Sequence, residues 1–352
     1  MRAVDAFVAL SITALLLGIP CESAAAKKRK RAKPIPPAEP SSEVAGHHHP
    51  IAIRGAEAQR LFDQGMTLVY GFNHEEAIRS FRRAAELDPQ AAMPLWGIAY
   101  ALGPNINLDV DPGRERMAHD ATQKALKLAA HSPENERAYV EALAKRYSDD
   151  PKADLKKLAV DFKDAMKAVS ERYPEDLDAA TIYAESLMNL RPWKLWTADG
   201  EPEEGTEELV AVLESVLRRD PKHIGANHYY IHAVEASREP ERALPAAERL
   251  AKLVPNAGHL VHMPAHIYMR TGNYAAAART NAEAARVDEA YIKSSGAAGV
   301  YPMMYYTHNL HFLAAAHAMA GHYTEGKRAA ERAVAAVVPH VAAMPMVEFI
   351  LP

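Results

Sequence analysis

Apolar and polar residues follow a helical period along most of the chain. In the predicted helix around residues 227–235, Asn227, Tyr230 and Val234 lie one turn apart and form a packing stripe. The histidines of this segment lie on the opposite face of the helix. No stretch sustains the two-residue alternation of a half-buried strand, so we expect no β-sheet. The periodic segments form helix pairs, which we place at residues 58–91, 93–102 with 117–129, 134–147 with 152–172, 176–190 with 205–219, 224–257, 258–291 and 307–340.

The helix pairs repeat with a period near 34 residues. Residues 58–91 carry small side chains at repeat positions 8, 20 and 27, a phenylalanine at 24 and a proline at 32; these are Gly65, Ala77, Ala84, Phe81 and Pro89. Small residues let two antiparallel helices touch, the phenylalanine fills the gap, and the proline ends the second helix. The pattern resembles the tetratricopeptide repeat. The resemblance implies an all-α, right-handed helical-hairpin solenoid of about seven helix pairs, with insertions, over residues 53–352.

The first 26 residues have the composition of a secretory signal peptide. Arg2 gives a positive start, residues 6–19 are almost wholly apolar, and residues 23–26 are small. The apolar run is shorter than a membrane span needs. A buried N-terminal helix is the alternative, and lipidation at Cys21 fits poorly after a proline. We therefore expect a secreted or periplasmic protein with no transmembrane segment in its mature chain.

Residues 27–52 form a basic, Pro-rich segment that we expect to be a disordered linker. Its part 27–50 carries a net charge of +4. A basic run can bind nucleic acid or act as a nuclear signal, but behind a signal peptide a tether is the better interpretation. The whole chain carries −4, which argues against a nucleic-acid partner. We assign no role to the histidines 47–49 on this segment.

Histidine and cysteine usage narrows the chemistry. The chain has 17 histidines and a single cysteine, Cys21, which lies within the predicted signal peptide. Disulfide scaffolds, cysteine-based zinc fingers and iron–sulfur clusters are thereby excluded. A metal site in the mature chain would have to use histidine and carboxylate ligands.

Four histidine-bearing segments, residues 71–77, 227–235, 259–268 and 305–312, are similar to a group of bacterial exported tetratricopeptide-repeat proteins. The resemblance implies that the first helix of each pair lines a concave groove through repeat positions 2, 5, 9 and 12. At positions 2, 5 and 9 of the last three repeats, seven of the nine residues are histidine, far above the share of 17 in 352 residues. They are His228, His232, His259, His262, His266, His308 and His311, with Gly225 and Ala315 at the other two.

A transition-metal site would explain why these histidines are gathered. His262 and His266 are one helical turn apart, a common spacing for two ligands of one metal. Neighbouring helix axes lie roughly 8–10 Å apart, so imidazoles from adjacent first helices can meet over one ion. A divalent Zn, Cu, Fe or Ni ion suits such thiolate-free donors. The predicted ligands are His228, His232, Glu235, His259, His262, His266, His308 and His311.

Two other interpretations of the histidine face stay open. The imidazoles can be satisfied structural residues, or they can form a groove that binds an anionic ligand or senses pH. Outside this face we interpret His74 as a helix-start residue. We interpret the remaining isolated histidines as ordinary core or surface residues: His119, His131, His223, His317, His322 and His340.

The sequence leaves two function classes. The first is an exported binding or scaffold protein whose groove takes a peptide or protein, although peptide-clamping relatives use Lys, Asn and Arg where this chain has His. The second is a metal-dependent enzyme, a hydrolase or an oxidoreductase, that uses the same cluster. The zinc-peptidase pattern HExxH is absent, and whether the protein is an enzyme stays open. The acid or base candidates are Glu185, Glu235, Tyr229, Tyr268 and Tyr306.

The C-terminal residues 341–352 are apolar, with Glu348 as their one charge. The seventh repeat ends near Pro339, and no polar helix follows, although a solenoid normally ends on a polar cap. We expect either an apolar edge that promotes self-association or a segment that folds back over the last repeat.

Overall fold

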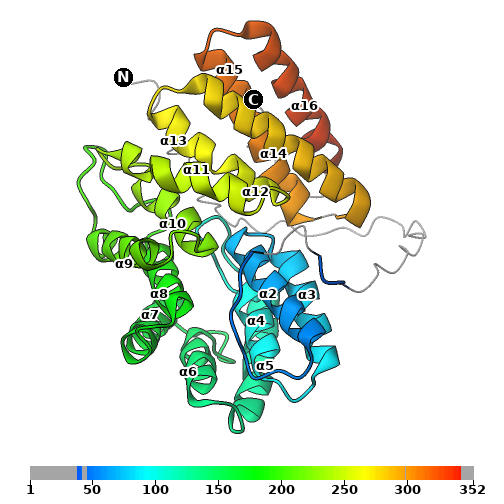
Figure 1. Cartoon of the computed structure of the whole chain (residues 1–352), viewed down its shortest axis with the longest axis vertical. Helices are drawn as coiled ribbons and strands as arrows, with labels where there is room; N and C mark the ends of the chain where they lie inside the picture. Colours follow the sequence, from blue (N-terminus) through cyan, green and yellow to red (C-terminus); the bar gives the residue numbers. More distant parts are fainter. Residues whose placement is uncertain (1–37, 42–45, 298, 342–352) are drawn as a thin grey trace. The chain divides into compact units, whose positions relative to one another are not determined.

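Antiparallel helix pairs follow one another from Ala56 to Val341 in the computed structural model, which describes residues 38–41, 46–297 and 299–341 (Figure 1). The pairs are α2 (Ala56–Tyr70) with α3 (His74–Leu87), α4 (Met93–Leu102) with α5 (Pro112–Ala129), α6 (Glu134–Leu143) with α7 (Leu155–Arg172), α8 (Leu177–Leu190) with α9 (Thr206–Arg219), α10 (Ile224–Val234) with α11 (Leu244–Leu253), α12 (Gly258–His262) and α13 (Pro264–Arg270) with α14 (Tyr274–Ser295), and α15 (Thr307–Met319) with α16 (Tyr323–Val341). Shorter turns are the 3₁₀ segments η2 (Ala144–Arg146) and η3 (Pro240–Ala243) and the π-helical turn η4 (Tyr301–Tyr306).

The prediction of an all-α solenoid of seven helix pairs is confirmed. The described part of the chain contains no strand, only two isolated bridges inside the insertions that follow α4 and α8. The predicted insertion at residues 103–113 is shorter than expected, because α5 already begins at Pro112. The predicted insertion at residues 294–306 contains the π-helical turn η4, which leads directly into α15.

Polar side chains begin many of these helices. The side chains of Asn73, Asp176 and Asn273 accept hydrogen bonds from the third amide of α3, α8 and α14, and those of Asp111 and Asp154 do the same for α5 and α7. Each bond satisfies one of the amides that a helix leaves free at its N-terminus. The residue directly before each of these helices therefore helps to determine where the helix begins.

Glycines allow the close contact between the first two pairs. The ring of Phe81 lies between Gly65 of α2 and Gly97 of α4, so close that a Cβ atom added to Gly97 would lie 2.7 Å from the ring. No side chain larger than hydrogen fits at either glycine unless the ring moves. The packing role that the sequence predicts for Gly65 and Phe81 is confirmed.

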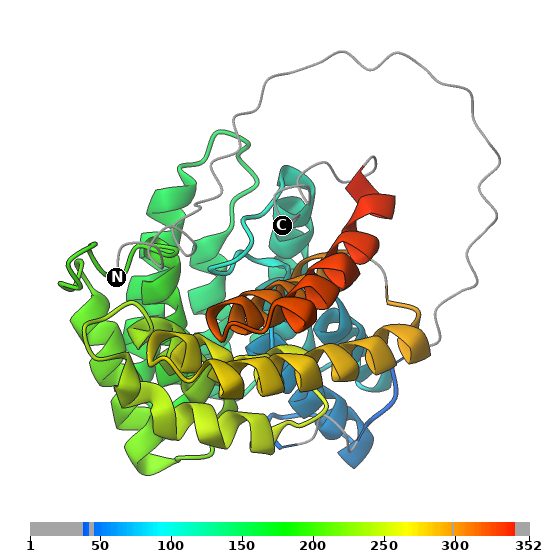
Figure 2. The ribbon, with the colours of Figure 1, turned by 90° about the horizontal axis from the view of Figure 1, so that it is seen from above.

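The first hairpin also contacts the fifth and sixth pairs, because the array curls back on itself (Figures 1 and 2). Helix α2 packs against α10, where a Cβ atom added to Gly225 would lie 2.5 Å from the ring of Tyr70. In α14, Tyr291 donates a hydrogen bond to Glu76 of α3 over 3.4 Å. The C-terminal end of α2 therefore covers the concave face of the last repeats, which is the face that carries the histidines.

Pro264 interrupts the first helix of the sixth pair. It has no amide hydrogen to give to the carbonyl of Leu260, one turn earlier, so the helix divides into α12 and α13. His259, His262 and His266 lie on the two sides of this break and remain buried.

The chain divides into two units, Met1–Pro36 and Pro37–Pro352, and all of the elements above belong to the second. The segment 46–52, which the sequence assigns to the linker, is part of the packed structure. There the amide of Ala52 donates to Glu136 of α6, and just beyond it Arg54 pairs with Asp88 over 2.8 Å.

The predicted signal peptide and the C-terminal edge at residues 342–352 lie outside the described residues. Among the helices that the structure describes, none is long and apolar enough to cross a membrane.

Candidate metal centre

Six histidines come together as two groups of three in the last three helix pairs. The first triad consists of His228 and His232 from α10 and His259 from α12. The second triad consists of His262 from α12, His266 from α13 and His308 from α15. Within each triad the three ligand atoms lie within 4.8 Å of one another. The histidine face predicted from the repeat register is therefore present, and it is compact.

Both triads lie inside the molecule. His228 and His262 have no exposed surface, and His308 is the most accessible of the six. Phe72, directly after α2, lies against the first triad with its ring centre 4.6 Å from that of His228, and its backbone holds a positive φ of 56°. Phe312 lies 4.9 Å from the ring of His262. The histidine part of the predicted concave groove is thus closed by aromatic rings.

Hydrogen bonds fix the protonation of two imidazoles. His228 contacts the carbonyl oxygen of Tyr70 through Nδ1 at 2.6 Å, and His262 contacts the amide oxygen of Asn281 through Nδ1 at 2.6 Å. The Asn281 amide nitrogen donates to the carbonyl of Ala277, which identifies the atom that faces His262 as oxygen. Both oxygens can only accept, so each Nδ1 carries the ring proton and each Nε2 keeps a lone pair.

Glu235 fixes two more imidazoles in the same way. Its two oxygens accept from Nδ1 of His232 at 2.8 Å and from Nδ1 of His266 at 2.7 Å. Burial would raise the pKa of the Glu235 carboxyl, but the attraction of His266 and the two hydrogen bonds hold it well below its usual range. Glu235 is therefore an ionised carboxylate that orients one ring of each triad.

The Nε2 atoms of these rings face one another. Nε2 of His262 lies 2.9 Å from Nε2 of His266, although both rings already carry their proton on Nδ1. Nε2 of His228 lies 3.2 Å from Nε2 of His259, and Nε2 of His232 is buried without a hydrogen-bond partner. Two lone pairs at 2.9 Å repel, so a positive charge, either a proton or a metal ion, must lie between His262 and His266.

Burial favours the neutral form of five of the six rings. Burial and the repulsion of neighbouring imidazoles hold the pKa of His228, His259 and His262 well below the usual range. The same causes lower the pKa of His308 to about 3. Burial also lowers the pKa of His232. Neutral imidazole is the form that coordinates metals.

The other predicted site residues lie around the triads in different ways. His311 is partly buried one turn after His308 and outside both triads. Of the predicted acid or base candidates, Glu185 is buried against Tyr100 and Asn189, and Tyr306 donates to Glu289. These contacts place both candidates in networks separate from the imidazoles. Tyr229 is buried with its ring centre 5.3 Å from that of His228, whereas Tyr268 is partly buried in a satellite apolar cluster.

A second polar cluster surrounds Asp178 of α8, and sequence reasoning missed it. The carboxylate is contacted by Nε2 of His47 at 3.0 Å, by Nδ1 of His49 at 2.8 Å, by Nε2 of His223 at 3.3 Å and by the hydroxyl of Tyr70. His223 also accepts a hydrogen bond from the amide of Ala226 at the start of α10. It is therefore a core residue with hydrogen-bond partners, as the sequence predicts. Nothing in the local sequence around residues 47–49 points to a carboxylate some 130 residues away.

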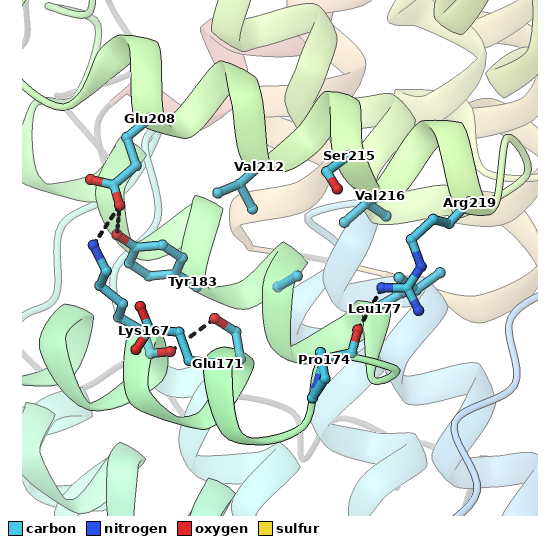
Figure 3. A pocket seen from close by; sticks show the side chains of 12 residues that line it. Lys167, Glu171, Pro174, Leu177, Tyr183, Glu208, Val212, Ser215, Val216 and Arg219 are labelled. Atoms are coloured by element: carbon cyan, nitrogen blue, oxygen red, sulfur yellow. Dashed lines mark hydrogen bonds and ion pairs between the residues drawn. The ribbon is translucent and has the colours of Figure 1, made fainter.

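A surface groove of about 370 Å³ lies between α7, α8 and α9 (Figure 3). Lys167 and Tyr183 both donate to Glu208 near one end, each over 2.7 Å, and Arg219 donates to the carbonyl of Pro174 near the other. None of the described residues that line it belongs to either triad. We therefore assign it no part in the chemistry of the histidines.

Comparisons with known proteins do not assign the chain to a family. No family model matches the chain, and no curated protein matches it. Among solved structures the chain is similar to YrrB, described as a TPR protein with an unusual peptide-binding site. The two sequences are 18% identical, and the match covers 58% of this chain and 90% of that chain with a TM-score of 0.28. A likeness this distant carries no argument about function. The helix pairs that follow one another along the chain define it as a helical-hairpin repeat protein.

The Asp178 cluster predicts a loss of stability at alkaline pH. Burial disfavours charged His49, but the hydrogen bond and attraction of Asp178, helped by Asp176 and Asp63, raise the pKa of His49 to about 9. Because the pKa is raised on folding, the stabilisation is complete below about pH 6.5 and is lost as the pH rises through 9. We expect the free energy of unfolding, measured by urea titration, to fall by on the order of 2–3 kcal/mol between pH 6.5 and 9.5.

Asp178→Asn is the control, because it removes the charge that holds the proton on His49. The fall between the two pH values should be much smaller in this variant. His49→Gln serves the same purpose if Asp178→Asn does not fold. A fall as large in the variant as in the unaltered protein would contradict this assignment.

Proposed function

We propose that this protein is an exported metal-binding repeat protein that holds a divalent transition metal ion on the inward-facing Nε2 atoms of its concave face. The observation that carries the proposal is the 2.9 Å contact between Nε2 of His262 and Nε2 of His266, whose Nδ1 atoms already donate to Asn281 and Glu235. A metal ion turns this repulsive contact into two coordinate bonds.

The distances fit two ligands of one ion. Metal–imidazole bonds are about 2.0–2.1 Å, so two nitrogens on one ion at angles of 90–110° are about 2.8–3.4 Å apart. The separations of 2.9 Å for His262 and His266 and 3.2 Å for His228 and His259 fall in this range. A shared proton would also relieve the first contact, but it would leave the buried Nε2 of His232 without a partner.

The surroundings of four of the rings match those of known metal sites. Ligating histidines usually donate their second ring proton to a carboxylate, a backbone carbonyl or a similar acceptor. Here Glu235 accepts from His232 and His266, the carbonyl of Tyr70 accepts from His228, and Asn281 accepts from His262. This donor set, with imidazole and without thiolate, suits Zn, Cu, Fe or Ni.

Two further roles belong to this proposal. A peptide or protein ligand would contact parts of the concave face other than the buried histidines, because aromatic rings cover these. A metal-dependent hydrolase or oxidoreductase is the second candidate function. It is favoured by triads of three nitrogens, since catalytic sites commonly keep three protein ligands and one open position.

Export is the part of the proposal that rests on the sequence alone. The apolar run of residues 6–19 and the small residues 23–26 support cleavage near Ala26. N-terminal sequencing of the protein recovered from an expressing cell should find a chain that begins near Lys27. Recovery of an intact chain that begins at Met1 would contradict export.

Metal content tests the site. Protein purified without an affinity tag and reconstituted with Zn²⁺, Cu²⁺ or Ni²⁺ should retain stoichiometric metal after desalting, and the metal should raise the melting temperature. His266→Ala should weaken metal binding at least 10-fold, because it removes one ligand and one of the two hydrogen-bond partners of Glu235. His131→Ala, which changes an exposed histidine, is the matched control and should bind like the unaltered protein.

Elemental analysis measures the amount of bound metal, and metal-chelator competition measures the binding affinity. Failure of the reconstituted, folded protein to retain any of the three metals would overturn the proposal. Equal binding by His266→Ala and His131→Ala would place the metal elsewhere.

A further inference from the structure

Six imidazoles, five of them buried, are more than one tetrahedral metal ion coordinates. A tetrahedral site takes four ligands, and a catalytic site commonly takes three from the protein. The six rings divide into two sets of three that share no residue: His228, His232 and His259, and His262, His266 and His308. One tetrahedral ion would leave at least two of these rings without a metal.

The two triads lie side by side. The ring centres of His232 and His266 are 5.1 Å apart, and those of His259 and His262 are 5.8 Å apart. Helix α12 supplies one ring to each triad, because His259 and His262 are three residues apart and share a helix face. Ions held by the two triads would therefore be neighbours.

Glu235 connects the two triads. One of its oxygens accepts from His232 in the first triad and the other accepts from His266 in the second. The same carboxylate thus sets the ring orientation on both sides.

We propose that the cluster is a dinuclear centre that binds two ions of the same transition metal, one on each triad, with a small oxygen ligand between them. This inference rests on the proposed metal-binding function and extends it. Three nitrogens leave each ion an open coordination position. Glu235 balances one of the four positive charges, so a solvent-derived hydroxide is the class of ligand that the site would take.

The test uses Cu²⁺ alone, added to the full-length, metal-free protein. After desalting, the unaltered protein should retain two Cu per chain. Two Cu²⁺ ions joined by an oxygen ligand couple their spins, so the integrated electron paramagnetic resonance signal per Cu should be several-fold weaker than that of an isolated Cu²⁺ site.

His228→Ala and His262→Ala form a matched pair of variants. Each removes one ring of one triad, and each ring donates through Nδ1 to an uncharged oxygen, so Glu235 keeps both of its partners. Each variant should retain one Cu per chain with the full signal of an isolated ion. The Gln replacements at the same positions serve if either Ala variant does not fold.

Trp193 gives a separate signal for the first triad. Its half-exposed ring lies edge-on to His232, with ring centres 5.4 Å apart, and its backbone has a positive φ of 61°. Cu²⁺ in the first triad should quench the fluorescence of Trp193, and His262→Ala should keep this quenching. His228→Ala should lose most of it, and Trp193→Phe identifies the contribution of this residue.

The outcomes separate the two proposals. One Cu per chain in the unaltered protein, lost in both variants, would mean a single shared ion; it would overturn the dinuclear centre and leave the proposed function standing. Two Cu per chain with an undiminished signal would overturn the bridging ligand. No bound Cu, Zn or Ni in the unaltered protein would overturn the proposed function itself.

Discussion

Four imidazole rings in this protein each donate a hydrogen bond through Nδ1, and the polar interior of the last three repeats depends on these four bonds. His228 donates to a main-chain carbonyl and His262 to an amide oxygen, while His232 and His266 donate to the carboxylate of Glu235. A neutral imidazole has one ring proton, so all four Nε2 atoms are acceptors. Two such acceptors only 2.9 Å apart, as Nε2 of His262 and Nε2 of His266 are, need a proton or a metal ion between them. A buried metal centre satisfies this requirement without protonating rings whose surroundings disfavour charge.

The curled array creates this arrangement. An open solenoid would leave its concave histidines in water, where each Nε2 could take a hydrogen from solvent. Here the end of α2 contacts α10, and Tyr70 supplies both the carbonyl that orients His228 and a hydroxyl that bonds Asp178. The N-terminal segment, held at Asp178 by His47 and His49, reinforces the same closure. The first repeat therefore completes the proposed metal site, whose candidate ligands come from the last three repeats.

The sequence predicts the structural features that depend on residues close to one another along the chain. Helix pairs, their starts and the histidine face follow from periodicity and from side chains such as Asn73 and Phe81, which act within one or two repeats. The acceptors that orient the rings could not be predicted, because the carbonyl of Tyr70 lies 158 residues from His228 and contacts it only after the array closes. Glu235 is one of the predicted ligands, and in the structure its two oxygens accept from Nδ1 of His232 and Nδ1 of His266. The role of His47 and His49 could not be predicted from nearby residues, because both contact Asp178, which is distant in the sequence.

Anomalous diffraction at the absorption edge of the bound metal tests the central claim most directly. Crystals of the metal-loaded protein should give an anomalous peak within about 2.0–2.1 Å of both Nε2 of His262 and Nε2 of His266, with Nδ1 of these rings still bonded to Asn281 and Glu235. A loaded crystal whose metal binds outside the triads, or whose imidazoles bind it through Nδ1, would contradict the account.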